Sequence, residues 1–330
     1  MSFLFPSPTI TFEAALRDLV SGKPRSRAMA AHALGDVTEP TEKRRAVDAL
    51  IAALDDNHPQ VRMEACAALG DLGEPSALPH LIKKLDDGVA PVRQNAAIAL
   101  GTLGHPDGFE PLATALKDGP PDLRFQAATS LAEIEPVRAF DHVLAALDDR
   151  DGQVVGAAAL SVGAIAKLDE ALKPRALSAL RAKIDHGDAS ARFDVAYALA
   201  ELGDEGGRAV LAKAATDVER AWDANSALGE LGATQELARA VSAKKTPPEA
   251  RVLAAGRLLA AGGGDDDTRG VLIDALTDRK IHVRGLAVEQ LTAVGGPWAK
   301  APLEKLARSG KGADLLEAIA AALRAIEGRS

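Results

Sequence analysis

One phrase recurs along the whole chain of 330 residues. It reads Val-Arg-x-x-Ala-x-x-Ala-Leu-Gly-x-Leu-Gly and is clearest at residues 61–73 and 92–104. A phrase that returns at a regular interval indicates a stack of repeated units, because one such unit buries too little apolar surface to be stable alone. The recurring phrase therefore restricts the possible folds more than any other feature of the sequence.

The arginine of the phrase fixes the register of ten units. Successive positions in this column are 29 to 37 residues apart. Where the phrase is degenerate, another residue occupies the column. The ten positions are Arg27, Arg62, Arg93, Arg124, Val155, Arg192, Ala221, Arg251, Arg284 and Leu316.

A second pattern lies between successive phrases. Residues 45–56 are an example, with apolar side chains three and four positions apart, which predicts an amphipathic helix. This first helix ends at a turn rich in Asp, such as Asp55-Asp56, and the phrase itself ends at a pair of glycines that suits a helix C-terminus. Each unit is thus predicted to be a helix pair, and the chain an all-α stack of about ten pairs.

The composition agrees with this fold and excludes several classes of protein. Hydrophobic residues make up 47% of the chain, but with only seven Phe, two Trp and one Tyr the core must consist mainly of Ala, Leu and Val. No apolar run is long enough to span a membrane. A net charge of -8 argues against a dedicated nucleic-acid binder, which needs a surplus of cations. The single Cys66 and a start without a signal-peptide pattern favour a cytoplasmic protein.

The repeated phrase and the Asp-rich turn before it resemble the HEAT-repeat family, in particular the short bacterial HEAT-like repeats that also occur in phycobilin lyases. The resemblance covers residues 9 to 327 and implies a right-handed α-α superhelix forming one domain over residues 1–330. We expect residues 1–37, with Phe3, Phe5 and Phe12, to cap one end, and residues 296–330 to cap the other. The family includes scaffolds, adaptors and a few enzymes, so the resemblance implies the fold more strongly than the function.

The recurring arginine is better explained by structure than by a ligand. It usually follows an aspartate by about six residues, as Arg62 follows Asp56, so contacts to Asp side chains and to the backbone could connect the turns of successive units. Two units depart from the rule. Val155 replaces the arginine in one, and residues 243–245 replace the aspartate before Arg251 in the other.

We expect looser stacking at the units of Val155 and Arg251, because each lacks one partner of this connection. Hydrogen exchange should be faster at these two junctions than at the others. Equal protection at all junctions would contradict this expectation.

A search for catalytic and metal-binding patterns finds none, so we expect no catalytic residues, no metal site and no cofactor. The histidines are scattered, and HExxH, GxSxG, GxGxxG and phosphate-loop motifs are absent. Cys66 occupies a column that is otherwise mostly Ala, which predicts a buried and unreactive thiol. The acids of the run 261–267 lack the ligand spacing of a calcium loop and are expected to cap the next helix.

The second helix of each pair is expected to line the concave side. If the repeated Ala and Leu residues point to the core, positions one and five after the arginine point away from it. These two columns include several large side chains, among them four of the few aromatic residues. They are Met63, Gln94, Ile98, Phe125, Leu160, Phe193, Tyr197 and Trp222.

Acidic residues dominate the flanking columns, two and nine positions after the arginine. The residues of interest here are Asp194, Glu201, Asp223 and Glu230. The four columns contain no Lys or Arg, although the chain has 39 of them. Basic residues gather instead in first helices and turns, for example at 244–245, which we expect to face outward. The aromatics could alternatively wedge between neighbouring second helices.

These patterns predict a non-enzymatic scaffold or adaptor, monomeric or weakly self-associating, that binds a basic and partly apolar protein segment in an acidic groove with aromatic side chains. The resemblance also allows an alternative, a lyase-like or chaperone-type protein that holds a tetrapyrrole or a client protein. A nucleic-acid-binding enzyme of the glycosylase type is disfavoured, because it needs cations on the predicted concave face.

Overall fold

The computed structural model describes residues 10–329, which form twenty α-helices and no β-strand. The helices form ten consecutive pairs, and the second helix of each pair contains the arginine column, so the all-α fold of ten helix pairs is confirmed. In chain order they are α1 (Phe12–Ser21), α2 (Pro24–Gly35), α3 (Pro40–Ala53), α4 (Pro59–Leu72), α5 (Leu78–Lys84), α6 (Ala90–Leu103), α7 (Phe109–Asp118), α8 (Pro121–Ile134), α9 (Pro136–Ala145), α10 (Gly152–Leu168), α11 (Lys173–Arg181), α12 (Ala189–Glu201), α13 (Arg208–Ala214), α14 (Ala221–Glu230), α15 (Thr234–Ser242), α16 (Pro248–Ala260), α17 (Asp266–Ala275), α18 (Ile281–Val294), α19 (Pro297–Ala307) and α20 (Leu316–Gly328).

Five short 3₁₀ helices complete the described elements. They are η1 (Pro75–Ala77), η2 (Pro106–Gly108), η3 (Ala146–Asp148), η4 (Glu205–Gly207) and η5 (Gly310–Leu315).

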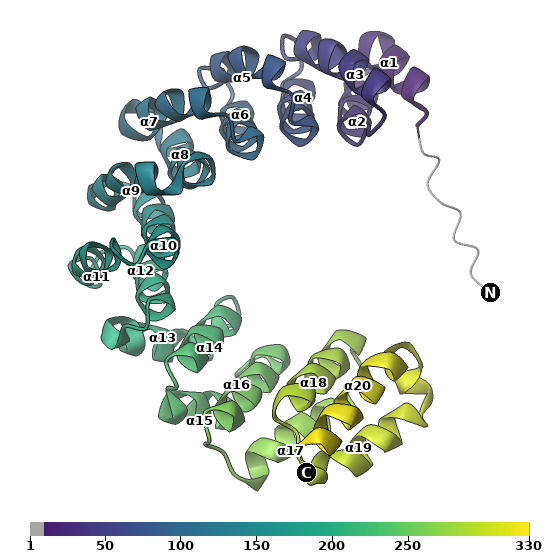
Figure 1. Ribbon diagram of the computed structural model, residues 1–330, viewed down its shortest axis with the longest axis vertical. Coiled ribbons are helices and arrows are strands. Elements are labelled where there is room, and N and C mark those ends of the chain that lie inside the picture. The colour runs from purple at the N-terminus through teal and green to yellow at the C-terminus, as the bar shows by residue number, and fades with distance from the viewer. Residues whose placement is uncertain (1–9, 330) are drawn as a thin grey trace. The chain divides into compact units, whose positions relative to one another are not determined.

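The chain divides into two compact units, Met1–Leu172 and Lys173–Ser330. In the first unit α2, α4, α6, α8 and α10 pack side by side and line the inner side of a curve, whereas α3, α5, α7 and α9 lie on its outer side (Figure 1). In the second unit α12, α14, α16, α18 and α20 pack in succession in the same way. Second helices therefore form the continuous layer within each unit.

Only part of the expected N-terminal cap lies within the described residues. Phe12 opens α1 and is half-buried, with the guanidinium of Arg45 5.0 Å from the centre of its ring. Phe3 and Phe5 lie outside the described residues. The capping roles of residues 1–37 and 296–330 stay predictions.

Small side chains allow the second helices to pack closely. Ala65, Ala68 and Leu69 on α4 are buried, as the repeat predicts. Cys66 is also fully buried, and burial raises the pKa of its thiol to about 12. A thiol that holds its proton at neutral pH is a poor nucleophile, so Cys66 acts as a small core residue.

The two glycines that end each phrase have different roles. Gly73 has φ 66° at the C-terminus of α4, a left-handed conformation that favours glycine. Gly70 lies inside the helix, where an added Cβ would come within 2.8 Å of the Cα of Ala99 on α6. The second glycine therefore ends the helix, as expected, whereas the first permits close contact between neighbouring second helices.

Four ion pairs connect successive repeats of the first unit. In each, the column arginine of one second helix pairs with an aspartate of the next repeat. The pairs are Arg27–Asp56 at 2.7 Å, Arg62–Asp87 at 2.8 Å, Arg93–Asp122 at 2.9 Å and Arg124–Asp149 at 2.7 Å. We call this row the Arg–Asp ladder.

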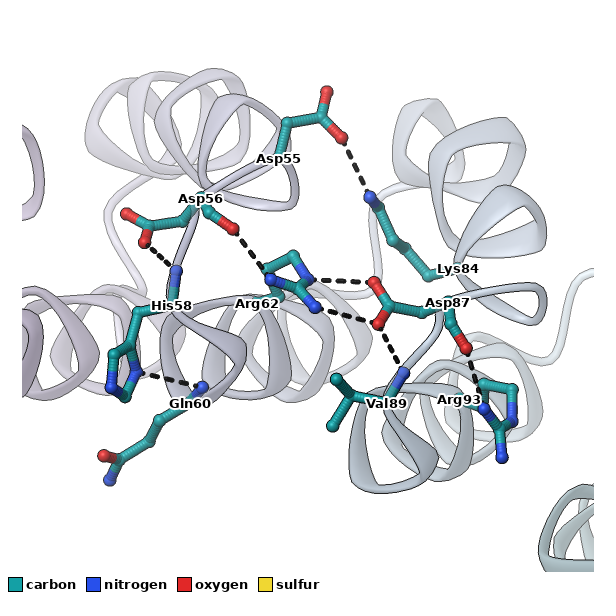
Figure 2. Close-up of polar contacts among 9 residues, drawn as sticks. All are labelled: Asp55, Asp56, His58, Gln60, Arg62, Lys84, Asp87, Val89 and Arg93. Carbon is teal, nitrogen blue, oxygen red and sulfur yellow. Dashed lines mark hydrogen bonds and ion pairs between the residues drawn. The ribbon is translucent and has the colours of Figure 1, made fainter.

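Each ladder arginine also binds its own repeat. Arg62 donates from Nη1 to the backbone carbonyl of Asp56 at 2.9 Å, while its other nitrogens reach the Asp87 carboxylate (Figure 2). Asp87 in turn accepts the backbone N–H of Val89 at 3.0 Å. The hydrogen bond from Arg62 lowers the pKa of Asp87 below its usual range. Arg62 therefore fixes both the turn of its own repeat and the turn of the next repeat.

The ladder ends inside the first unit. Val155 occupies the arginine position on α10, in the last repeat before the boundary at Leu172. In the second unit Arg284 donates to the backbone carbonyls of Asp278 and Lys311, and none of the column arginines forms an ion pair with an aspartate among the described residues. The compact unit and the ladder thus extend over nearly the same part of the chain.

Replacing Arg62 with Ala should destabilise the protein by about 2–3 kcal/mol, because it leaves a largely buried carboxylate without its partner. The side chains of Arg62 and Asp87 are only 15% and 7% exposed. Lys43→Ala is the control, since the Lys43–Glu74 pair is 31% and 41% exposed and its loss should cost less than about 1 kcal/mol. Urea unfolding measures both, and equal losses would contradict a structural role for the ladder.

Candidate binding surface

An apolar row crosses the second helices of the first unit. Ile98 on α6, Phe125 on α8 and Leu160 on α10 are exposed by 41%, 38% and 41%. These three helices are consecutive neighbours, and α7 covers the side of α8 that faces away from the inner curve. The row therefore opens toward the inner side of this unit. Met63 on α4 and Gln94 on α6, which share the column of Phe125, are half-buried.

A second surface lies on α12 and α14, in the second unit. Trp222 is 44% exposed, Tyr197 is half-buried and Asp223 is exposed. The two helices pack against each other, so these residues belong to one small area. We call the area formed by Asp194, Tyr197, Trp222 and Asp223 the α12–α14 patch.

Asp194 is the unusual member of this patch. Its carboxylate is partly buried, and its pKa is raised, mainly because burial disfavours the charged form; nearby Asp188 and Asp223 add to this, whereas Arg220 opposes it. Among residues 10–329 it has no hydrogen-bond or ion-pair partner. A carboxylate that is held partly out of water without a partner can gain from a cation brought by a ligand.

The prediction that Phe193 is exposed is wrong. Phe193 is only 7% exposed, because the guanidinium of Arg220 lies over its ring at 4.5 Å and Tyr197 packs against it with ring centres 6.4 Å apart. The same column is also buried at Gly156 and Val252. Phe193 therefore follows the alternative prediction, in which the aromatic side chain lies between neighbouring second helices. A helical wheel misses this because it ignores side chains that approach from the next repeat.

The acidic edge is also less free than expected. Glu230 pairs with Arg257 of the following repeat at 3.0 Å, so its charge is already neutralised. Glu201 is half-buried. Arg257 lies six positions after its column residue and therefore outside the columns that were considered. Of the four acids, Asp194 and Asp223 belong to the patch.

The acids of residues 261–267 have the expected structural role. Asp265 caps α17 by accepting the backbone N–H of Thr268 at 2.9 Å. Within residues 10–329 no group of three or more His, Cys, Asp and Glu side chains is arranged to hold a metal ion. No helix in this part of the chain is sufficiently long and apolar to cross a membrane.

Replacing Asp194 with Asn should stabilise the protein at neutral pH by less than about 1 kcal/mol, because the amide avoids the cost of burying a charge. The raised pKa means that the native carboxyl recovers stability as the pH falls through that pKa, so the advantage of Asn should vanish in acid. Thermal unfolding from pH 7 to pH 3 measures this. Asp223→Asn, at an exposed carboxylate, is the control, and a stability loss for Asp194→Asn would show that the carboxylate has an internal partner.

The comparisons with known proteins agree with this architecture. The family described as HEAT repeats matches residues 12–95 and 79–163. No curated protein matches the sequence. Importin beta is similar in structure with a TM-score of 0.56 and 13% identity, covering 96% of this chain and 52% of its own.

Two further solved structures are similar. The Escherichia coli protein YibA has a TM-score of 0.50 at 18% identity and covers 93% of this chain and 98% of its own. The complex of CpcE and CpcF of phycocyanin lyase from Nostoc sp. PCC7120 has a TM-score of 0.44 at 23% identity, with 81% and 94% covered. At these identities the likeness concerns the fold. The family match spans residues 12–163, and the helix pairs and the repeated phrase continue the same pattern through the rest of the described residues, so this chain has the fold of a HEAT-like repeat solenoid.

Proposed function

We propose that the protein is a non-enzymatic scaffold or adaptor, and that the α12–α14 patch binds a basic and partly apolar segment of a protein partner. The observation that carries the proposal is the partly buried carboxylate of Asp194, which forms no hydrogen bond or ion pair within residues 10–329 and lies in the same patch as the exposed ring of Trp222. An aromatic face beside an acid without an ion pair is complementary to Arg or Lys with an apolar neighbour.

The chemistry of recognition follows from these groups. A guanidinium or ammonium group of the partner would lie over the Trp222 ring while it pairs with Asp194 or Asp223. The ion pair would offset the unfavourable burial of the Asp194 carboxylate. Binding would therefore remove a free-energy cost that is present in the unbound protein. Phe193, beneath Arg220, would support the patch from below without touching the partner.

The apolar row of the first unit is a separate contact surface in this proposal. Ile98, Phe125 and Leu160 would hold apolar side chains of the partner, together with Met63 and Gln94. A stack of packed helices needs no folding on binding, so little conformational entropy is lost by the scaffold. A cytoplasmic location stays a prediction.

The alternative suggested by the family resemblance is a protein that holds a tetrapyrrole or a client protein. Visible absorbance on mixing with a bilin, followed by transfer to a target cysteine, would distinguish a tetrapyrrole-binding protein from the scaffold.

Trp222→Ala should weaken binding of the partner about tenfold or more, because an exposed aromatic anchor dominates small interfaces. A partner is first captured from native lysate with the wild-type protein, and its affinity for each variant is then measured by calorimetry. Leu316→Ala, which removes an exposed apolar side chain of the same unit, is the control. Equal affinities of the Trp222→Ala variant and the wild type would exclude the patch.

Asp194→Asn should weaken the same complex at low salt and much less at high salt, since the lost attraction is screened by ions. The variant should remain as stable as the wild type or become more stable, so a loss of affinity cannot be attributed to unfolding. Affinity that does not depend on ionic strength would contradict the electrostatic part of the proposal.

A further inference from the structure

The second unit contains a cavity of about 790 Å³ whose rim is mainly basic. Its charged side chains come from α12, from α13 and from the turns before α14 and α16. They are Arg192, Lys213, Arg220 and Lys245, with Asp217 as the one acid. In a chain with a net charge of -8, four cations around one cavity are a local reversal of sign.

None of the four cations forms an ion pair with a carboxylate among residues 10–329, although Asp188 lies near Arg192 and Asp194 lies near Arg220. Within residues 10–329, Lys213 and Lys245 have no ion-pair partner, and both side chains are exposed. Arg220 donates from Nη2 to the Ser190 hydroxyl at 2.6 Å, but its Nη1 is buried without a hydrogen-bond acceptor. A buried N–H group without an acceptor is costly, and an oxygen atom from a ligand would satisfy it.

The cavity includes Arg192, the first column arginine after the ladder ends. Arg192 still donates from Nη1 to the backbone carbonyl of His186 at 3.0 Å, as Arg62 does to Asp56. Its remaining nitrogens have no carboxylate within ion-pair distance among the described residues. In the first unit an aspartate of the following repeat occupies the corresponding position.

Asp217, the nearest aspartate before the next column position, does not supply the missing partner. Asp217 lies four residues before the column residue Ala221, whereas Asp87 lies six before Arg93. Asp217 accepts the backbone N–H of Glu219 at 2.9 Å and so holds its own turn, but it does not pair with Arg192. This repeat therefore keeps the aspartate-stabilised turn before α14 but lacks the ion pair to Arg192 of the preceding repeat.

We propose that this cavity binds an oxyanion, a carboxylate or a phosphoryl group, on a side chain of a partner protein. The oxyanion would take the position of the missing ladder aspartate at Arg192 and accept the free N–H of Arg220, with Lys213 and Lys245 adding attraction at the rim. Phe193 and Val210 would contact the apolar neighbour of the acidic residue. This site would take an anionic segment, whereas the neighbouring α12–α14 patch is proposed to take a basic one.

Three synthetic peptides of one sequence test the proposal, with Ac-Gly-Leu-X-Leu-Gly-amide carrying aspartate, phosphoserine or asparagine at X. The aspartate or the phosphoserine peptide should bind the full-length protein measurably by calorimetry, and the asparagine peptide should not. The relative affinity of the two anionic peptides shows which oxyanion is preferred. Absence of binding by both would overturn the proposal.

Lys213→Gln with Lys245→Gln should weaken binding of the anionic peptide roughly tenfold without unfolding the protein, since both side chains are exposed and form no ion pair with the residues that the structure describes. The matched control is Lys23→Gln with Lys244→Gln, which removes the same charge from exposed lysines outside the cavity. Equal weakening by both double variants would show non-specific attraction and overturn the proposal. Arg192→Gln should reduce binding further than either lysine change alone.

Discussion

The Arg–Asp ladder is the interaction on which the order of the first unit depends. Each arginine is only slightly exposed and uses its flat, forked head to hold a carbonyl of its own turn and a carboxylate of the next repeat. Lysine could not make both contacts with one rigid group. Close helix packing through Gly70 and Ala99 then sets the distance between repeats, while the ladder fixes their register.

Two departures from the ladder pattern coincide with other features of the chain, the boundary between the two units and the basic cavity. Val155 stands in place of the arginine, and the boundary between the two compact units falls directly after the repeat that contains it. Asp217 does not pair with Arg192, and a cavity rimmed by cations includes the guanidinium of Arg192. A repeated structure makes such positions conspicuous, because the intact repeats show what each residue would otherwise do.

The candidate surfaces illustrate the limits of a helical wheel. The wheel places Phe125 and Trp222 correctly on exposed sides of their helices, and it fails for Phe193, which occupies the same column. Arg220, one residue before its own column position, reaches across to cover that ring. Arg257 neutralises Glu230 from the next repeat in the same way. Both contacts join different repeats, which a pattern read within one repeat does not contain.

The sequence by itself determined the all-α class, the ten helix pairs, their register and the buried, inert state of Cys66, because these follow from local periodicity and from small side chains at fixed positions. Tertiary structure decided which carboxylate each arginine binds, which aromatic rings stay exposed and where cations surround a cavity. Those outcomes depend on long side chains that reach from one repeat to the next, and a pattern within one repeat does not contain such contacts.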